Sequence, residues 1–528
     1  MTKIYDVVVI GGGHNGLVCA AYLAKAGRSV KVLERRSVVG GAAITEEFHP
    51  GFRNSVCSYT VSLLNRKVVD DLRLYDFGLQ IVPRPLANFM PLGESGYLKS
   101  FADRDHMVAE ISRHSTTDAA RWSDYQQTLS RLAAVLKSLI LETPPNAGGG
   151  FGELWKTWKT ASRFRKLSLE DQRNFADIMT MSAADFLGRW FRHDAVLALY
   201  GFDGIVGTLA SPFSPGTAYV LLHHCFGDLL EPAGTWGHAI GGMGAITQAM
   251  AKSAETAGAE IEVSVPVVEV LVRDGRSYGV RLANGREIRA RAVVANVNPK
   301  LLFGQLVEAA HLPPEFATRI QNFKCRSGTF RMNVALSELP DFSCLPGRER
   351  QEHHQSGIIM APSLDYMEQA YRDAIDHGWS RRPVVEMLIP STLDDTLAPV
   401  GKHVASLFCQ HFNPTLPDGR SWDTCRQQAA ESILDTVSEF APNFRQSIIA
   451  TQILSPLDLE RDFGLVGGDI FHGSLDLNQI FSARPVLGHA AYRMPVAGLY
   501  LCGSGAHPGG GVTGAPGHNA AHEILKDQ

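Results

Sequence analysis

The sequence lacks the patterns that define several large classes of protein. No apolar run reaches about 18 residues, so no membrane-spanning helix is expected. The net charge is −4 and no long basic arm is present, so nucleic-acid binding is not expected. The eight cysteines form no CxxC or CxxxxC pair, and we expect neither a local zinc motif nor a disulfide framework. Dispersed thiols indicate a reducing compartment. We expect a cytoplasmic protein, since a strand that begins by about Ile4 leaves no room for a signal peptide.

A second nucleotide-binding signature is also missing. Only one Gly-x-Gly-x-x-Gly motif follows a strand, and residues 241–244 (GGMG) lack the third glycine. Without a second motif or a CxxxxC dithiol, a disulfide reductase with a separate NADPH domain is disfavoured. The 528 residues are too many for one core and predict two or three domains.

The clearest positive signal is the hexapeptide GGGHNG at residues 11–16. An apolar strand precedes it at residues 5–10, and a helix-compatible stretch follows at residues 14–26. Residues 29–33 then predict a second strand. This order of strand, glycine loop, helix and strand is typical of a unit that binds a dinucleotide.

Each position of the motif has a physical role. Gly11 permits the tight turn, Gly13 lets the backbone approach a pyrophosphate, and Gly16 lets the helix pack close to the strand. His14 and Asn15 fall in the first helical turn, where free N–H groups and the helix dipole attract phosphate. We therefore predict cofactor contacts at all five residues. Both NAD and FAD fit this unit.

The residues after the second strand favour FAD. Glu34 ends that strand and can accept hydrogen bonds from an adenosine ribose. The stretch ERRSVVGGAA, residues 34–43, resembles the extended FAD signature of the glutathione-reductase-like superfamily, in its amine oxidase and phytoene desaturase branch. The resemblance implies that Gly40 and Gly41 bring backbone to the ribityl and phosphate region.

One position departs from that signature. Many members of the branch carry Arg or Lys where this chain has Ala42, so one phosphate contact has to be made otherwise. Arg35 and Arg36 are available for it, although both also fit an ordinary solvated surface. We include Arg35 and Ala42 among the predicted cofactor residues.

A middle segment predicts a return to the cofactor domain. Residues 292–296 resemble the strand that rejoins the main sheet, and Asn296 ends it as a predicted cofactor contact. The resemblance implies that the backbone of Val267 touches the adenine, although Val267 also fits a strand position without a ligand. The segment starts with a helix and a strand and continues as a three-strand meander: residues 245–257, 260–263, 267–272, 277–282 and 287–290.

The C-terminus carries a second glycine-rich loop, GSGAHPGGGVTG at residues 503–514, between a short strand and a helix that begins near Ala515. So many glycines indicate backbone pressed against a flat ligand. A helix N-terminus at the flavin pyrimidine edge would stabilise negative charge on the reduced ring. A flexible tail is the alternative. The predicted flavin contacts in this loop are Gly503, Ser504, His507, Gly511 and Val512.

Two histidines are candidates for proton transfer. His507 lies in the flavin loop, and His472 lies in a stretch that resembles the segment leading back to the flavin. The ordinary pKa of histidine suits proton transfer near neutrality. Each residue also fits a structural, hydrogen-bonded histidine. No Ser-His-Asp order or paired-carboxylate motif stands out.

The predicted fold class is α/β, with a Rossmann-like FAD-binding domain and β-meander interleaved with an α+β substrate domain that contains a helical subdomain. The resemblance covers nearly the whole chain and looks closest to the bacterial relatives of pyridine nucleotide-disulphide oxidoreductase domain-containing protein 2. The predicted FAD-binding segments are 1–100, 236–300 and 481–528, the helical subdomain is 101–235, and the remaining substrate domain is 301–480.

Residues 151–166 of the helical subdomain interleave aromatic and basic side chains, with tryptophans at 155 and 158. This pattern fits a peripheral membrane or lipid-entry patch. It also fits an ordinary helix whose tryptophans pack inward.

The leading functional hypothesis is an FAD-dependent oxidoreductase that dehydrogenates, saturates or isomerises C–C bonds of a hydrophobic, isoprenoid-like small molecule. A flavin amine oxidase is the second hypothesis and predicts an aromatic cage near the flavin. The third is a non-enzymatic interaction protein that FAD stabilises, which predicts a flavin walled off from every cavity.

Overall fold

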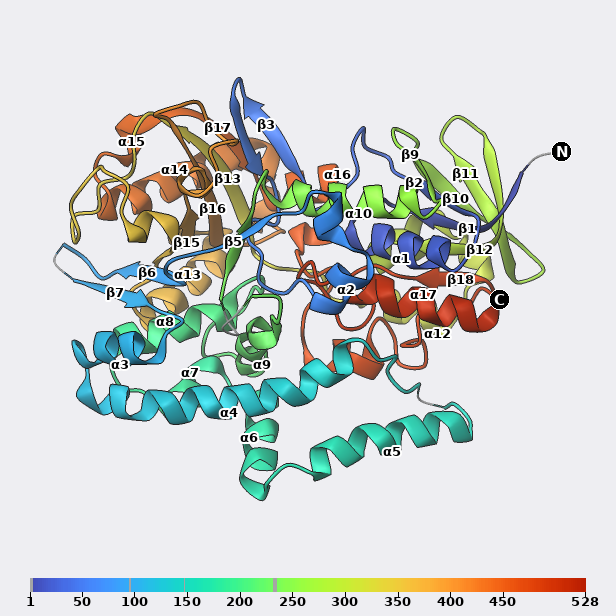
Figure 1. The fold of residues 1–528 in the computed structure, drawn as a ribbon, viewed down its shortest axis with the longest axis horizontal. Helices are drawn as coiled ribbons and strands as arrows, with labels where there is room; N and C mark the ends of the chain where they lie inside the picture. Colours follow the sequence, from blue (N-terminus) through green and yellow to red (C-terminus); the bar gives the residue numbers. More distant parts are fainter. Residues whose placement is uncertain (1–2, 95, 147, 231–234) are drawn as a thin grey trace.

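The computed structural model describes residues 3–94, 96–146, 148–230 and 235–528. Two seven-stranded sheets lie side by side, and a group of helices covers one edge of both (Figure 1). The predicted α/β class is confirmed. Three large apolar cores correspond to the first sheet with its helices, the helical group, and the second sheet with its helices.

The first sheet is built from chain segments far apart in the sequence. Its order is β10-β11-β12-β1-β2-β9, and β18 also pairs with β12. Strands β9, β2, β1, β12 and β18 run parallel, as a doubly wound nucleotide-binding sheet requires. The strands are β1 (Ile4–Ile10), β2 (Val30–Leu33), β9 (Glu260–Glu262), β10 (Val267–Arg273), β11 (Arg276–Leu282), β12 (Glu287–Ala295) and β18 (Leu499–Leu501).

Strand β12 differs from its prediction. Residues 287–290 and 292–296 are predicted as separate strands, one in the meander and one in the main sheet, but β12 is continuous. Its first half pairs antiparallel with β11, and its second half pairs parallel with β18. Both halves pair parallel with β1 on the opposite side. A nine-residue strand is long enough to serve both neighbours in turn.

The second sheet is mostly antiparallel, in the order β17-β13-β16-β15-β14-β6-β7. The two strands at one end of this sheet, β6 and the edge strand β7, belong to residues 88–100, which the predicted boundaries give to the first FAD-binding segment. The seven strands are β6 (Asn88–Pro91), β7 (Tyr97–Ser100), β13 (Phe330–Leu336), β14 (Gly357–Met360), β15 (Trp379–Leu388), β16 (His403–Phe412) and β17 (Ile448–Leu454). Two further hairpins pair β3 (Thr45–His49) with β4 (Phe52–Ser55) and β5 (Ile81–Pro83) with β8 (Gly237–Ala239).

The helices form three groups. Helices α1 (His14–Lys25), α10 (Met243–Thr256) and α17 (Ala515–Asp527) pack together on the first sheet. Helices α13 (Leu364–His377) and α14 (Trp422–Phe440) pack on β15 of the second. The helical group is α3 (Arg104–Ser112), α4 (Thr116–Ile140), α5 (Phe151–Arg165), α6 (Leu169–Thr180), α7 (Ala183–Leu187), α8 (Asp194–Ile205) and α9 (Thr217–His223). Shorter helices are α2 (Arg66–Asp71), α11 (Pro299–Leu301), α12 (Pro314–Gln321), α15 (Phe444–Ser447) and α16 (Pro456–Phe463).

Candidate active site

The site is built where the parallel strands of the first sheet end. Ile10 lies opposite both Leu33 and Ala295, and Ala295 lies opposite Leu501, so four strands stop in one row. The loops that follow this row begin at Gly11, Glu34, Asn296 and Cys502. The carboxyl edge of a parallel sheet is where such folds bind their ligands, and all of these loops meet there.

The glycine loop has the geometry that its sequence predicts. Gly11 has a φ of +94°, which favours glycine at this turn. A Cβ on Gly16 would lie 2.3 Å from the carbonyl oxygen of Gly11, so helix α1 packs against the loop only with glycine here. A Cβ on Gly13 would lie 2.9 Å from Nδ2 of Asn296, whose amide also donates to the carbonyl oxygen of Gly11 at 3.2 Å.

The second glycine pair lies against the first loop. The Gly40 N–H donates to the carbonyl oxygen of Gly12 at 2.9 Å, and Gly40 forms a parallel bridge with Gly13. Gly41 has a φ of +57°, a conformation that favours glycine. A Cβ added there would lie 3.1 Å from the Cα of Gly13. Two loops of bare backbone thus face one another, as close approach to phosphate groups requires.

Glu34 is oriented by backbone amides on both sides. One carboxylate oxygen accepts from the N–H of Gly12 at 2.8 Å, and the other accepts from the N–H of Arg36 at 2.9 Å. The side chain is buried, yet it borders the cavity at the strand ends. A carboxylate held in this way has lone pairs left for the hydroxyl groups of a ribose.

A cavity of about 190 Å³ opens along this row of loops. It extends from the meander, at Val267, to Phe463 and Gly464 at the end of α16. The predicted cofactor residues in its lining are Gly11, Gly13, His14, Glu34, Arg35, Gly41, Ala42, Val267, Asn296 and Ser504. Arg35 also donates to the carbonyl oxygens of Arg461 and Asp462, which fixes its guanidinium at the rim.

A second cavity of about 110 Å³ shares a wall with the first. Four residues border both cavities: His14, Ala42, His472 and Ser504. Gly511 and Val512 of the C-terminal loop line only the second cavity. The predicted flavin residues are therefore split between the two cavities, with the shared residues at their junction.

The junction fits a polar ligand. Burial lowers the pKa of His14 to about 3 and that of His472 to about 4, so both rings are neutral near pH 7. Among the described residues, nothing hydrogen-bonds to Nε2 of His14 or to Nδ1 of His472, although both atoms are buried. Buried ring nitrogens without partners are rare, and a polar group of a bound flavin would satisfy them.

Five predicted residues lie away from the linings of these two cavities: Gly16 and Gly40, whose contacts are given above, and Asn15, Gly503 and His507. Asn15 donates to Oγ of Ser504 at 3.1 Å and so joins α1 to the C-terminal loop. Gly503 packs against Asn296, where a Cβ would lie 3.1 Å from its amide oxygen. His507 is buried, and its Nε2 lies 3.1 Å from the carbonyl oxygen of Leu139 at the end of α4. This contact gives His507 a structural role, and its predicted part in proton transfer stays a prediction.

The C-terminal loop is held by a fully buried arginine that the sequence analysis does not single out. Arg484 donates twice to the carbonyl oxygen of Ser504, at 3.1 and 2.7 Å, and once to that of Phe471 at 2.7 Å. Burial lowers its pKa to about 10, which leaves it charged at neutral pH. The guanidinium therefore ties the flavin loop to the segment that carries His472.

The second cavity contains a buried carboxylate that the sequence analysis also misses. Glu386 on β15 accepts a hydrogen bond from the hydroxyl of Tyr59, and both residues line the cavity. Burial raises the pKa of Glu386, while the Tyr59 hydroxyl and the charges of Arg84 and Arg331 lower it. Its sequence signal is a single acid within the apolar run PVVEMLIP at residues 383–390.

A third cavity, of about 300 Å³, lies along α4 and carries a second acid, the half-buried Asp203. His224 and Trp236 line both this cavity and the second one. Burial, and then the charge of Glu386, raise the pKa of Asp203 on α8 to about 7. Among the described residues, none donates a hydrogen bond to its carboxylate. The third cavity therefore leads from α4 toward the second one and has an acid of near-neutral pKa in its wall.

The parallel sheet, the two glycine loops and the second cavity beside them together have the arrangement of an FAD-dependent oxidoreductase. Residues 16–329 match the family described as flavin containing amine oxidoreductase. The chain belongs to this family.

Three comparisons place it further. It is 40% identical to pyridine nucleotide-disulfide oxidoreductase domain-containing protein 2 of Rattus norvegicus, over 99% of this chain and 94% of that protein. It is 24% identical to prolycopene isomerase 2, chloroplastic, of an Oncidium hybrid cultivar, over 99% of this chain and 84% of the relative. A triple mutant of putrescine oxidase has the same fold, with a TM-score of 0.62, 17% identity and complete coverage of both chains.

Proposed function

We propose that the protein dehydrogenates, saturates or isomerises a C–C bond of a hydrophobic, isoprenoid-like small molecule, which binds in the second cavity. The observation that carries this proposal is the lining of that cavity beside the predicted flavin residues. Its apolar members include Leu63, Phe202, Val206, Leu465, Ile470 and Phe471. Such a lining favours an apolar substrate, and the relative named for prolycopene supports the same class.

The cofactor would carry the hydride, and the residues of the cavity would position the substrate and handle the proton. Bound FAD supplies hydride transfer at its N5 atom. The chain has to place the reacting bond, exclude water and handle the proton. Glu386 is suited to the proton, because burial raises its pKa and the hydroxyl of Tyr59 fixes its carboxylate. Asp203, in the adjoining cavity, is placed to exchange that proton with its surroundings.

An amine oxidase is the second candidate, and the family description favours it. Aromatic rings of Tyr59, Phe202, Trp236 and Phe471 border the second cavity, as an aromatic cage would require. The charges argue against an ammonium group, however. Arg84 and Arg331 both lower the pKa of Glu386, so two cations already act on this carboxylate, the one acid among the described residues of that lining. An amine substrate would add a third positive charge.

The third hypothesis predicts a flavin walled off from every cavity. Five predicted cofactor residues line the second cavity (His14, Ala42, Ser504, Gly511 and Val512), which opposes that arrangement.

Anaerobic reduction of the bound flavin tests the proposal. FAD-loaded protein is mixed with a series of isoprenoid hydrocarbons and alcohols, and separately with mono- and diamines, while flavin absorbance is followed. We expect bleaching, with loss of two hydrogens from the substrate by mass spectrometry, in the isoprenoid series. The reverse direction is tested by reoxidation of chemically reduced flavin, and isomerisation by chromatography of the products. Reduction by amines alone, with release of hydrogen peroxide in air, would refute the proposal and support an amine oxidase.

Glu386→Gln separates the role of the carboxylate from that of cavity shape. The amide is isosteric and keeps a partner for Tyr59, so FAD content and substrate affinity should stay near those of the wild type. We expect turnover to fall by about 10²–10⁴-fold, the usual contribution of a positioned acid or base. Wild-type turnover in Glu386→Gln would remove this residue from proton transfer.

A further inference from the structure

Helix α5 presents an apolar stripe to the outside of the molecule. None of its side chains is buried. Phe151 is 91% exposed, Trp155 63% and Trp158 56%, and Leu154 is exposed as well. At about 100° per residue these four residues share one face of the helix. The rings of Trp155 and Trp158 stack at 5.0 Å, which makes one continuous apolar surface.

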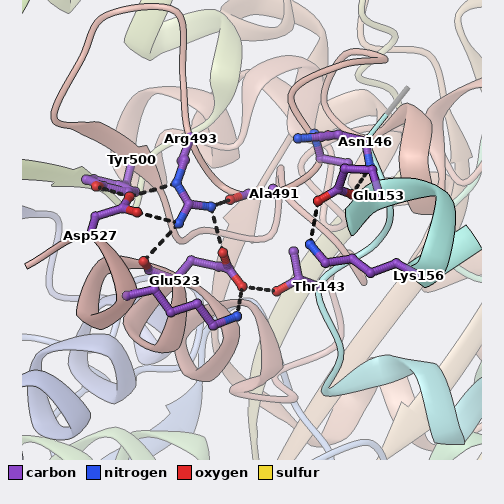
Figure 2. A network of polar contacts seen from close by, with 11 residues as sticks. Thr143, Asn146, Glu153, Lys156, Ala491, Arg493, Tyr500, Glu523 and Asp527 are labelled. Atoms are coloured by element: carbon purple, nitrogen blue, oxygen red, sulfur yellow. Dashed lines mark hydrogen bonds and ion pairs between the residues drawn. The ribbon is translucent and has the colours of Figure 1, made fainter. Parts of the chain in front are cut away.

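The opposite face of α5 faces the protein and is polar except for Phe164, whose ring packs on Phe175 of α6. Arg163 donates to the carbonyl oxygen of Ser138 at 3.0 Å and pairs with Glu142 at 2.6 Å, both at the end of α4. Glu153 accepts from the N–H of Asn146 at 2.7 Å and pairs with Lys156 at 2.6 Å (Figure 2). A surface helix of a globular protein normally buries its apolar face, whereas α5 exposes its apolar stripe.

Hydrogen bonds of the segment that precedes α5 hold the helix with its apolar stripe facing outward. The Asn146 side chain accepts from the N–H of Ala490 at 2.9 Å, and Thr143 donates to Glu523 of α17 at 2.7 Å. Glu523 is in turn paired with Arg493 at 2.6 Å (Figure 2). The beginning of α5 is therefore fixed to the FAD-binding part of the chain. Figure 1 shows α5 lying along the outer side of α4, away from both sheets.

The charge of the segment identifies what would cover the stripe. Residues 151–166 carry five basic residues and one acidic residue, a net charge of +4 in a chain whose total is −4. Basic residues flanking exposed tryptophans match an anionic bilayer surface, where the rings enter the interface and the cations meet phosphate groups. In a symmetric dimer, this segment would face the same segment of the second copy, and two net charges of +4 would repel one another.

We propose that α5 is a docking helix for an anionic lipid bilayer. Its stripe of Phe151, Leu154, Trp155 and Trp158 enters the interface, and the exposed Arg165 and Lys166 at the end of the helix contact the lipid headgroups. The docking is peripheral, since no helix of the described residues is both long enough and apolar enough to cross a membrane. It does not depend on the identity of the substrate.

Vesicle co-sedimentation tests this surface with the FAD-loaded full chain. The vesicles are phosphatidylcholine alone, or phosphatidylcholine with about one-third phosphatidylglycerol. We expect binding to the anionic vesicles that weakens as salt is raised, because screening acts on the basic residues. The double variant Trp155→Ser/Trp158→Ser should lower the partition coefficient at least tenfold. Val400→Ser is the matched control, since Val400 is fully exposed on the loop between β15 and β16 and should leave binding unchanged.

Two readouts keep the test decisive. Neither tryptophan is buried, so the double variant should retain its FAD and its Tm. Quenching of wild-type tryptophan fluorescence by lipids brominated on their acyl chains needs no variant at all. Equal sedimentation of the wild type with and without vesicles would overturn the proposal. So would a wild-type dimer that the double variant converts to a monomer, which would assign the stripe to a second copy.

Discussion

Gly13→Val is the most direct perturbation of the cofactor site. Gly13 has a φ of −72°, which any residue adopts, so the substitution adds no backbone strain. Its effect is steric. The new Cβ would lie 2.9 Å from Nδ2 of Asn296, and the two methyl groups beyond it would enter a cavity of about 190 Å³. These atoms occupy the space in which a pyrophosphate meets bare backbone.

The size of the effect follows from overpacking. Extra methyl groups in a packed site cost about 1–3 kcal/mol. At about 1.4 kcal/mol per tenfold, this weakens FAD binding by about 5- to 150-fold. We expect the upper end, because the pyrophosphate cannot move away from the glycine loops that hold it. At a free FAD concentration of 100 Kd the wild type gains about 2.7 kcal/mol of stability. A 100-fold weaker variant at the same concentration gains only about 0.4 kcal/mol.

Flavin content after purification, and the Tm with and without added FAD, measure both quantities. Gly304→Ala is the control, since its Cβ would meet no atom within 4 Å. Added FAD should raise the Tm of the wild type and of this control, and should hardly change that of Gly13→Val. A Gly13→Val protein that is purified yellow, with wild-type flavin content, would refute the assignment of this loop to the pyrophosphate.

Two further predictions concern His507 and Asp203. His507→Ala should lower the free energy of unfolding by about 1–2 kcal/mol, because it removes the contact to Leu139, while FAD content persists; an unchanged stability with slower turnover would instead support a catalytic His507. Asp203 has a pKa of about 7 in the folded chain against an ordinary 3.8, so between these values the folded state binds more protons and stability falls as pH rises. Asp203→Asn removes that fall, and urea unfolding at pH 5 and pH 8 should show the variant gaining on the wild type at pH 8; parallel stability–pH curves would contradict the raised pKa.

Local motifs allowed much of the first sheet to be predicted. The glycine loop, Glu34 and the Gly40-Gly41 pair lie close together in the sequence, and each constrains backbone that is adjacent in the chain. The C-terminal loop was recognisable for the same reason. Continuous pairing along β12 was not, because a strand can change partners without any break in its alternation of side chains.

The substrate side of the site depends on contacts between distant segments. Tyr59, Asp203 and Glu386 come from a loop, a helix and a strand, and no spacing rule relates them. The available signal was a lone acid in an apolar segment, as in PVVEMLIP, and burial of a carboxylate commonly marks a functional site. The composition of α5 was equally visible, but which of its faces points outward depends on the polar groups that α4 presents to it.

The wall shared by the first two cavities has a consequence for the order of assembly. His14, Ala42, His472 and Ser504 line both the first cavity and the second, more apolar one. A flavin that completes this wall has to be loaded before a substrate finds a closed binding surface. A substrate that then fills the apolar cavity blocks movement of the flavin on that side. Cofactor release should therefore slow when a tight apolar ligand is bound, so that the ligand and the flavin retain one another.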